Sequence, residues 1–183
     1  LIDTAVDVIN EVGDIREVTL TQIAKEAGVS PATAYNHFPD RMEDVFSAIV
    51  HSKMDVAANM GATLADDSLS VIEKLKQIPV TYAENLVSLG YAGKVVVVQM
   101  FNLVNVNKWL DQDPVQAITV LLSNSEQYKD GAEEIAVNIA TAFRGAMFEY
   151  ALNIGDHELF NRYSEEFFLK TSSNLVENIL KQY

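Results

Sequence analysis

Residues 18–38 constrain the fold of this chain more than any other part of it. Two runs in this stretch, about 20–27 and 31–37, have the pattern of short helices and are separated by a tight turn. Apolar residues in the first run recur at the i, i+3, i+4 and i+7 spacing that buries one face of a helix. They are Leu20, Ile23, Ala24 and Ala27. We therefore expect two short helices, the first with one buried face.

The turn between the two runs has the chemistry to end one helix and begin another. Gly28 suits the end of the first helix because glycine tolerates positive φ. Ser30 can cap the next helix, and Pro31 suits its first position, where no amide donor is needed. A hydroxyl near Thr19 to Thr21 can cap the first helix in the same way. Two helices joined in this manner are the layout of a DNA-reading helix-turn-helix.

The same stretch resembles the DNA-binding domain of TetR-family transcriptional regulators. Its Ala-Gly-Val-Ser turn is common to helix-turn-helix segments, whereas its Tyr-x-His-Phe close, followed by a basic residue, is more particular to this family. The matching residues are Thr21, Ile23, Ala24, Ala27, Gly28, Val29, Ser30, Thr33, Tyr35, His37, Phe38 and Arg41. The family usually has lysine at the last position, and Arg41 keeps the charge but not the point geometry.

This resemblance, strong over residues 1 to about 50, implies an all-α fold with two domains. Residues 1–50 would form an N-terminal three-helix helix-turn-helix DNA-binding domain, and residues 51–183 a C-terminal helical domain that binds an effector and dimerises. We expect helices at about 1–12, 41–64, 68–89, 94–109, 114–125, 130–154 and 156–183. The segment 41–64 is expected to be one stiff rod between the domains, since no Gly/Ser linker separates them.

Two of these helical segments carry residues that complicate the prediction. Pro79 predicts a kink or a break within residues 68–89. The run Val95-Val-Val-Val98 is ambiguous with a strand by propensity alone. The length of its segment and its helical surroundings favour a buried helix.

Composition excludes several classes of protein. Cysteine is absent, so the chain has no disulfide framework and no thiolate chemistry. No run approaches the ~20 apolar residues that a membrane span needs, and no signal-peptide pattern opens the chain. Because the chain starts at Leu1, within a predicted helix, we expect further residues before it in the natural protein. The inferred access to DNA predicts a cytoplasmic location.

The charge of the chain argues against DNA binding at first sight. The formal net charge is −13, and residues 1–53 hold four Lys or Arg against nine carboxylates. Nucleic-acid binders usually show a basic footprint. Distribution matters more than the sum, so we expect Arg41 and the helix N-termini to face phosphates while Asp3, Asp7 and Glu11 face away. Modest non-specific affinity follows.

The candidate DNA-binding residues lie on the exposed side of the helix-turn-helix. Asn36 can pair with adenine, and the methyl group of Thr33 suits thymine. Thr19, Thr21, Tyr35, His37 and Arg41 are better suited to phosphates, which position the domain without specifying sequence. Packing against Phe38 is an alternative role for Tyr35 and His37. The full set is Thr19, Thr21, Ser30, Pro31, Ala32, Thr33, Tyr35, Asn36, His37 and Arg41.

A small-molecule site in the C-terminal domain is implied by the resemblance alone. Its candidate lining is Tyr82, Met100, Phe101, Trp109, Phe143, Met147 and Tyr150. Apolar walls with few polar groups suit an aromatic or lipophilic effector. The alternative is that these residues simply form the core of the domain. Gln99, Asn102 and Asn105 are either polar anchors for the effector or the solvent side of their helix.

The last two segments, 130–154 and 156–183, are apolar over wide arcs. Helices of that kind need partners on more than one side. Either both arcs pack within one monomer, or one arc builds a two-fold four-helix interface, where TetR-like proteins pair. A homodimer would place two recognition units one DNA turn apart, on a palindromic operator in double-stranded DNA.

Catalytic and metal chemistry find no support in the sequence. The three histidines are scattered, without metal-ligand spacing, and phosphate loops and nucleophile elbows are absent. We expect no catalytic residues, metal, cofactor or enzyme activity, and no membrane partner. The favoured function is a repressor that leaves its operator when an effector binds. The alternatives are an activator or co-regulator that works through a protein partner without a small ligand, and a helical enzyme or lipid-binding module.

Overall fold

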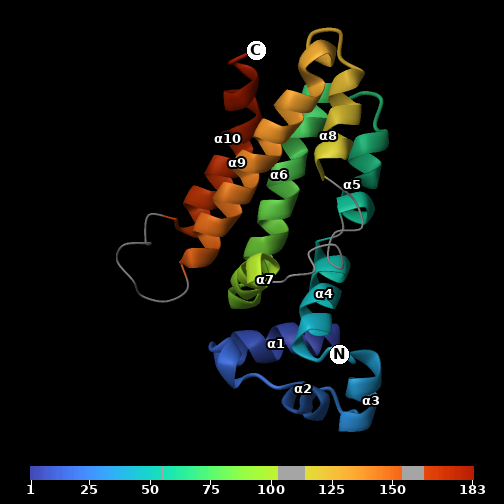
Figure 1. Ribbon diagram of the computed structural model, residues 1–183, viewed down its shortest axis with the longest axis vertical. Coiled ribbons are helices and arrows are strands. Elements are labelled where there is room, and N and C mark those ends of the chain that lie inside the picture. Colours follow the sequence, from blue (N-terminus) through green and yellow to red (C-terminus); the bar gives the residue numbers. More distant parts are fainter. Residues whose placement is uncertain (55, 103–113, 154–162) are drawn as a thin grey trace.

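The computed structural model describes residues 1–54, 56–102, 114–153 and 163–183 (Figure 1). Within these ranges every regular element is a helix, which confirms the all-α fold class. The elements are α1 (Ile2–Val12), η1 (Ile15–Glu17), α2 (Leu20–Glu26), α3 (Pro31–His37), α4 (Met42–Lys53), α5 (Val56–Ala65), α6 (Val71–Ser88), α7 (Tyr91–Asn102), α8 (Pro114–Ser123), η3 (Lys129–Gly131), α9 (Ala132–Leu152) and α10 (Glu165–Leu180).

Helices α1, α2 and α3 form a compact unit at one end of the molecule, and α4 leads from it toward the remaining helices (Figure 1). Ala5, Ile9, Ile23, Ala24 and Ala34 are fully buried in this unit. Methylene and methyl burial of this kind supplies the main favourable free energy of packing. The two short helices predicted for residues 20–37 are confirmed.

The expected rod over residues 41–64 is wrong as one helix. Helix α4 ends at Lys53, and Met54 leaves the helical region with φ −118° and ψ 10°. The Met54 side chain is buried, so the chain turns where this side chain enters the core. Helix α5 then begins at Val56, and the ammonium of Lys74 donates to the Leu64 carbonyl at 2.9 Å near its end.

Helix α6 runs through Pro79 rather than breaking there. Its start is fixed by a capping box, in which Ser70 and Glu73 exchange hydrogen bonds between side chain and backbone. These bonds from Ser70 also lower the pKa of the Glu73 carboxyl. The interior proline is buried, so packing offsets the backbone hydrogen bond that proline cannot make.

The remaining predicted segments are confirmed where the structure describes them. The valine-rich segment is a helix over Tyr91–Asn102, and the last two segments are the long helices α9 and α10. The predicted continuation over 103–109 and the predicted boundary at Gly155 lie outside the described residues. No helix in the described part of the chain is long and apolar enough to cross a membrane.

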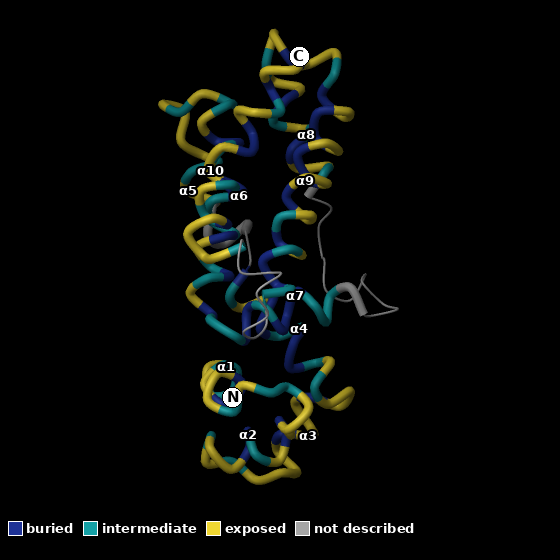
Figure 2. The backbone as a smooth tube through the Cα atoms, turned by 90° about the vertical axis from the view of Figure 1, so that its left-hand side faces the viewer, coloured by how far each residue is buried: buried dark blue, intermediate teal, exposed yellow. Residues whose placement is uncertain are grey.

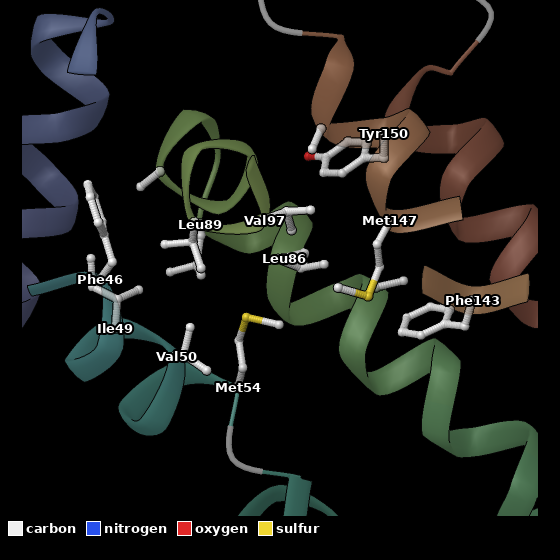
Figure 3. Packing of buried hydrophobic residues seen from close by; sticks show 14 of the residues in the cluster. Phe46, Ile49, Val50, Met54, Leu86, Leu89, Val97, Phe143, Met147 and Tyr150 are labelled. Atoms are coloured by element: carbon white, nitrogen blue, oxygen red, sulfur yellow. The ribbon is translucent and has the colours of Figure 1, made fainter. Parts of the chain in front are cut away.

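One hydrophobic core runs from the three-helix unit into the C-terminal helices (Figure 2). Figure 3 shows the side chains that make this connection, from α4 through the end of α6 and α7 to α9. They are Phe46, Ile49, Val50, Met54, Leu86, Leu89, Val97, Phe143, Met147 and Tyr150. Because protein cores are close-packed, displacement at one end of this cluster is felt at the other.

Candidate nucleic-acid interface

All ten predicted DNA-contacting residues are exposed. They come from the start of α2, from α3 and from the turn before α4, at the end of the molecule farthest from the C-terminus (Figure 1). They are Thr19, Thr21, Ser30, Pro31, Ala32, Thr33, Tyr35, Asn36, His37 and Arg41. Their exposure leaves this end of the molecule available to a macromolecular partner.

Side-chain caps fix both helices of the unit. Thr19 Oγ1 accepts from the Gln22 amide at 3.2 Å, and Ser30 Oγ accepts from the Thr33 amide at 3.1 Å. The Ser30 and Thr33 hydroxyl oxygens also lie 2.9 Å apart in a hydrogen bond. These bonds satisfy amides that a helix start leaves without partners. Ser30 is therefore a capping residue as well as an exposed one.

The recognition helix α3 buries one face and presents the other. Ala34 is fully buried and Phe38, directly after the helix, is 7% exposed. Asn36 lies on the exposed face, and no described residue hydrogen-bonds its side-chain amide. An amide in that position can donate and accept at once, as the edge of adenine requires. His37 stays exposed while its ring lies 6.4 Å from that of Phe38, so both of its predicted roles stay open.

Arg41 has an unusual backbone conformation. Among the described residues it is the only one other than glycine with positive φ, at φ 57° and ψ −124°. Its guanidinium carbon lies 6.0 Å from the centroid of the Tyr35 ring, a cation–π distance. A residue in such a conformation costs of order 1–3 kcal/mol, and such strain concentrates at functional sites. In this conformation the Arg41 cation lies beside Tyr35 of α3.

Two of the four cations in this domain are paired with carboxylates. The Arg16 guanidinium lies 2.6 Å from Asp14, and hydrogen bonds from Arg16 lower the pKa of that carboxyl to about 2. Lys53 lies 2.5 Å from Asp3 on α1, which lowers the pKa of Asp3. Figure 1 places α1 between the α2–α3 pair and the C-terminal helices. The acidic face of α1 is therefore set back from the exposed end of α3.

Lys25 and Arg41, in contrast, form no ion pair within the described residues. Lys25 lines a shallow groove across the exposed side of the unit, together with Thr19, Thr21, Gln22, Val29 and Pro31. Lys25 and Gln22 are not among the DNA-contacting residues predicted from the sequence. For Lys25 the signal was present, because positions 21 and 25 share one face of a helix by the i, i+4 spacing.

The structure brings together four of the seven predicted effector residues. The rings of Tyr82 and Phe143 lie 5.9 Å apart, and Met147 is 8% exposed beside them. Phe168, which was not predicted, stacks on Tyr150 at 4.5 Å and on Phe143 at 6.3 Å. Met100 is partly buried against the core. The side chains of Phe101, Asn102, Asn105 and Trp109 lie outside the described residues.

The hydroxyl group of Tyr150 sets this residue apart from the apolar side chains around it. This hydroxyl is buried and has no hydrogen-bond partner among the described residues. Burial raises the pKa of this phenol to about 12, with a further contribution from the charge of Glu165, so the hydroxyl is a neutral donor at pH 7. The Lys94 ammonium lies 5.1 Å from the ring centroid and donates to the Asn153 carbonyl at 2.9 Å.

Helices α9 and α10 bury one arc and leave another uncovered. Phe168 and Leu175 are buried between helices of this chain, whereas Val137, Phe148 and Phe167 are 45%, 37% and 46% exposed. The dimer prediction needs an apolar arc that the chain leaves exposed, and these three residues are candidates for it. Among the described residues, no three His, Asp or Glu side chains gather in a way that could hold a metal ion.

These features define a helix-turn-helix DNA-binding protein, with its reading unit at one end of a molecule that is all helical in its described parts. Residues 1–49 match the sequence model of the bacterial regulatory proteins of the tetR family. These residues form a TetR-family N-terminal DNA-binding domain. The family consists of regulators and not of enzymes. No curated protein matches the chain significantly.

Proposed function

We propose that this regulator is a homodimeric repressor, released from a palindromic operator by a small and largely apolar effector. The observation that carries the proposal is the continuous core between α4 and α9 (Figure 3). A molecule inserted beside Met147 displaces side chains that pack, through Leu86 and Val97, on α4. Since α4 follows the recognition helix directly, the displacement moves the reading unit.

In this proposal the exposed face of α3 reads the base sequence of the operator. Asn36 and Thr33 contact base edges in the major groove. Thr19, Thr21, Tyr35, His37 and Arg41 contact phosphates, joined by Lys25 from the groove on α2. The exposed Ser30, Pro31 and Ala32 allow the start of α3 to approach the duplex closely. In this proposal the protein acts on DNA in the cytoplasm.

The uncovered arc of α9 and α10 is the proposed dimer interface. Exposed Phe148 and Phe167 each bury a large apolar area when covered, and such residues dominate interface free energies. A two-fold contact uses the same surface on both protomers. It sets the distance between the two reading units, on which binding to both operator halves depends.

The buried hydroxyl of Tyr150 refines the chemistry of the proposed effector. A buried donor without a partner is costly, and an effector with a carbonyl or carboxylate oxygen would satisfy it. The aromatic neighbours Tyr82, Phe143 and Phe168 suit an apolar body. For the effector to release DNA, it must bind one spacing of the reading units better than the other.

A variant that fills the proposed site tests this mechanism. Met147→Trp adds bulk beside Phe143, as the effector would. We expect it to weaken binding to a full palindrome by about tenfold or more, while its circular-dichroism spectrum stays helical. Val120→Trp, on the exposed side of α8, is the matched control and should bind as the unmodified chain does. Equal affinity of Met147→Trp and the control for the palindrome would contradict release through this site.

The second candidate function is an activator or co-regulator that acts through a protein partner without a small ligand. The net negative charge of residues 1–53 favours it, because weak phosphate attraction leaves DNA affinity dependent on a partner. Co-purification of one stoichiometric protein partner, together with unchanged DNA binding by Met147→Trp, would support this alternative.

A further inference from the structure

The corner between α6 and α7 (residues 89–93) contacts the DNA-reading unit directly. Gly90 precedes α7 and has φ 62°. It carries no side chain that could accept from the amides at the start of α7. The oxygen is supplied from α1, because Asn10 Oδ1 accepts from the Ala92 amide at 2.9 Å. The N-terminus of α7 is thus capped by a residue of the other domain.

Two positions in this corner have little space for a side chain. A Cβ atom added at Gly90 would lie 3.2 Å from Asn10 Oδ1, tighter than ordinary van der Waals contact. A Cβ atom at Gly93 would lie 2.3 Å from the Leu86 carbonyl oxygen, so only glycine allows α7 to leave α6 so closely. Gly90 lets α1 approach the corner, and Gly93 lets α7 pack closely on the end of α6.

A second hydrogen bond joins the same two parts of the chain. The Tyr91 hydroxyl accepts from the Ile15 amide at 3.3 Å, in η1, just after α1. The corner therefore holds the end of α1 and the turn that follows it. Because α1 packs on both α2 and α4, these two bonds act on the whole reading unit.

We infer that Asn10 and Tyr91 are positioning residues that set the orientation of the DNA-reading unit on the C-terminal domain. The inference rests on the proposed dimeric repressor, in which this orientation fixes the distance between the two reading units. The two hydrogen bonds connect the C-terminal domain to the reading unit separately from the hydrophobic contacts of α4. Movement of α6 or α7 acts on α1 through two polar bonds, which depend strongly on distance and angle.

The distance between reading units can be measured because the chain has no cysteine. A Glu26→Cys variant of the full chain carries one nitroxide label per protomer on an exposed position of α2. Double electron–electron resonance then reports the separation of the two units. We expect one narrow distribution, broadened by Asn10→Ala and by Tyr91→Phe. Asn10→Asp, which keeps an acceptor oxygen at a helix N-terminus, should restore the narrow distribution, and Asn124→Ala is the control.

DNA binding gives a second readout that a loss of folding would not reproduce. Asn10→Ala should bind a selected palindrome about tenfold more weakly and a single half-site as tightly as the unmodified chain. An Asn10→Ala distribution as narrow as that of the control, or equal losses on palindrome and half-site, would overturn the inference. Absence of any dipolar signal in the singly labelled parent would overturn the dimer itself, and the inference with it.

Discussion

Replacing Tyr150 with phenylalanine should stabilise this protein, although the side chain is fully buried. The substitution removes only the hydroxyl, for which the described part of the chain supplies no hydrogen-bond partner. An unsatisfied buried polar group costs about 1–3 kcal/mol. The oxygen leaves a void smaller than a methyl group, which costs at most about 1 kcal/mol. The free energy of unfolding should therefore rise by about 1–2 kcal/mol, and Tm by about 2–8 °C for a chain of this size.

The matched control is Tyr91→Phe, which removes a hydroxyl that does have a partner. We expect this variant to lose about 0.5–1.5 kcal/mol, so the two substitutions should differ in sign. Thermal and urea unfolding at one protein concentration would measure both, because dimer stability depends on concentration. A Tyr150→Phe variant less stable than the parent would refute the reasoning and show that this hydroxyl is satisfied.

Other predictions concern the DNA-facing end and the uncovered arc. Arg41→Gly should raise the free energy of unfolding by about 1 kcal/mol, because glycine adopts the observed φ of 57° without strain. The same variant should bind duplex DNA more weakly. A lower free energy of unfolding in urea would contradict the assignment of backbone strain to Arg41. Lys25→Gln should lower the slope of log K against log salt by about 1, and an unchanged slope would place Lys25 away from phosphate. Phe148→Glu should dissociate the dimer in analytical ultracentrifugation. An unchanged mass would exclude this arc of α9 and α10 as the dimer interface. Arg16→Gln should return the pKa of Asp14 from about 2 toward 3.8 in an NMR titration; in the parent the pair stabilises the fold above pH 3.8 and is lost as pH falls toward 2, and an unchanged pKa would exclude Arg16 as the cause.

Local chemistry made the reading unit predictable from the sequence. The caps at Thr19 and Ser30 and the turn at Gly28 depend on neighbours within three or four residues, and all are present. The backbone of Arg41 was not predictable, because arginine has no preference for positive φ. The end of α4 at Met54 could not be predicted from the sequence either. The apolar pattern continues past it, and only packing with distant helices ends α4 there.

Contacts between distant segments were beyond the reach of sequence patterns. Asn10 and Ala92 are 82 residues apart, and nothing in either segment indicates that one caps the other. The stacking of Phe168 on Tyr150 likewise joins two helices whose register is set by the whole C-terminal domain. Apolar spacing identified Tyr150 as buried, but the missing partner of its hydroxyl follows from three-dimensional packing alone.

Sequence-specific reading of DNA by Asn36 is the central claim, and selection of random duplexes tests it most directly. The full chain, Asn36→Ala and the control Asn124→Ala would each select from the same pool at one salt concentration, since affinity depends strongly on salt. We predict one palindromic motif for the parent and the control, with the preference at one base pair of each half lost in Asn36→Ala. An identical motif for all three, or no enriched motif at low salt, would contradict the assignment of this face as the reader.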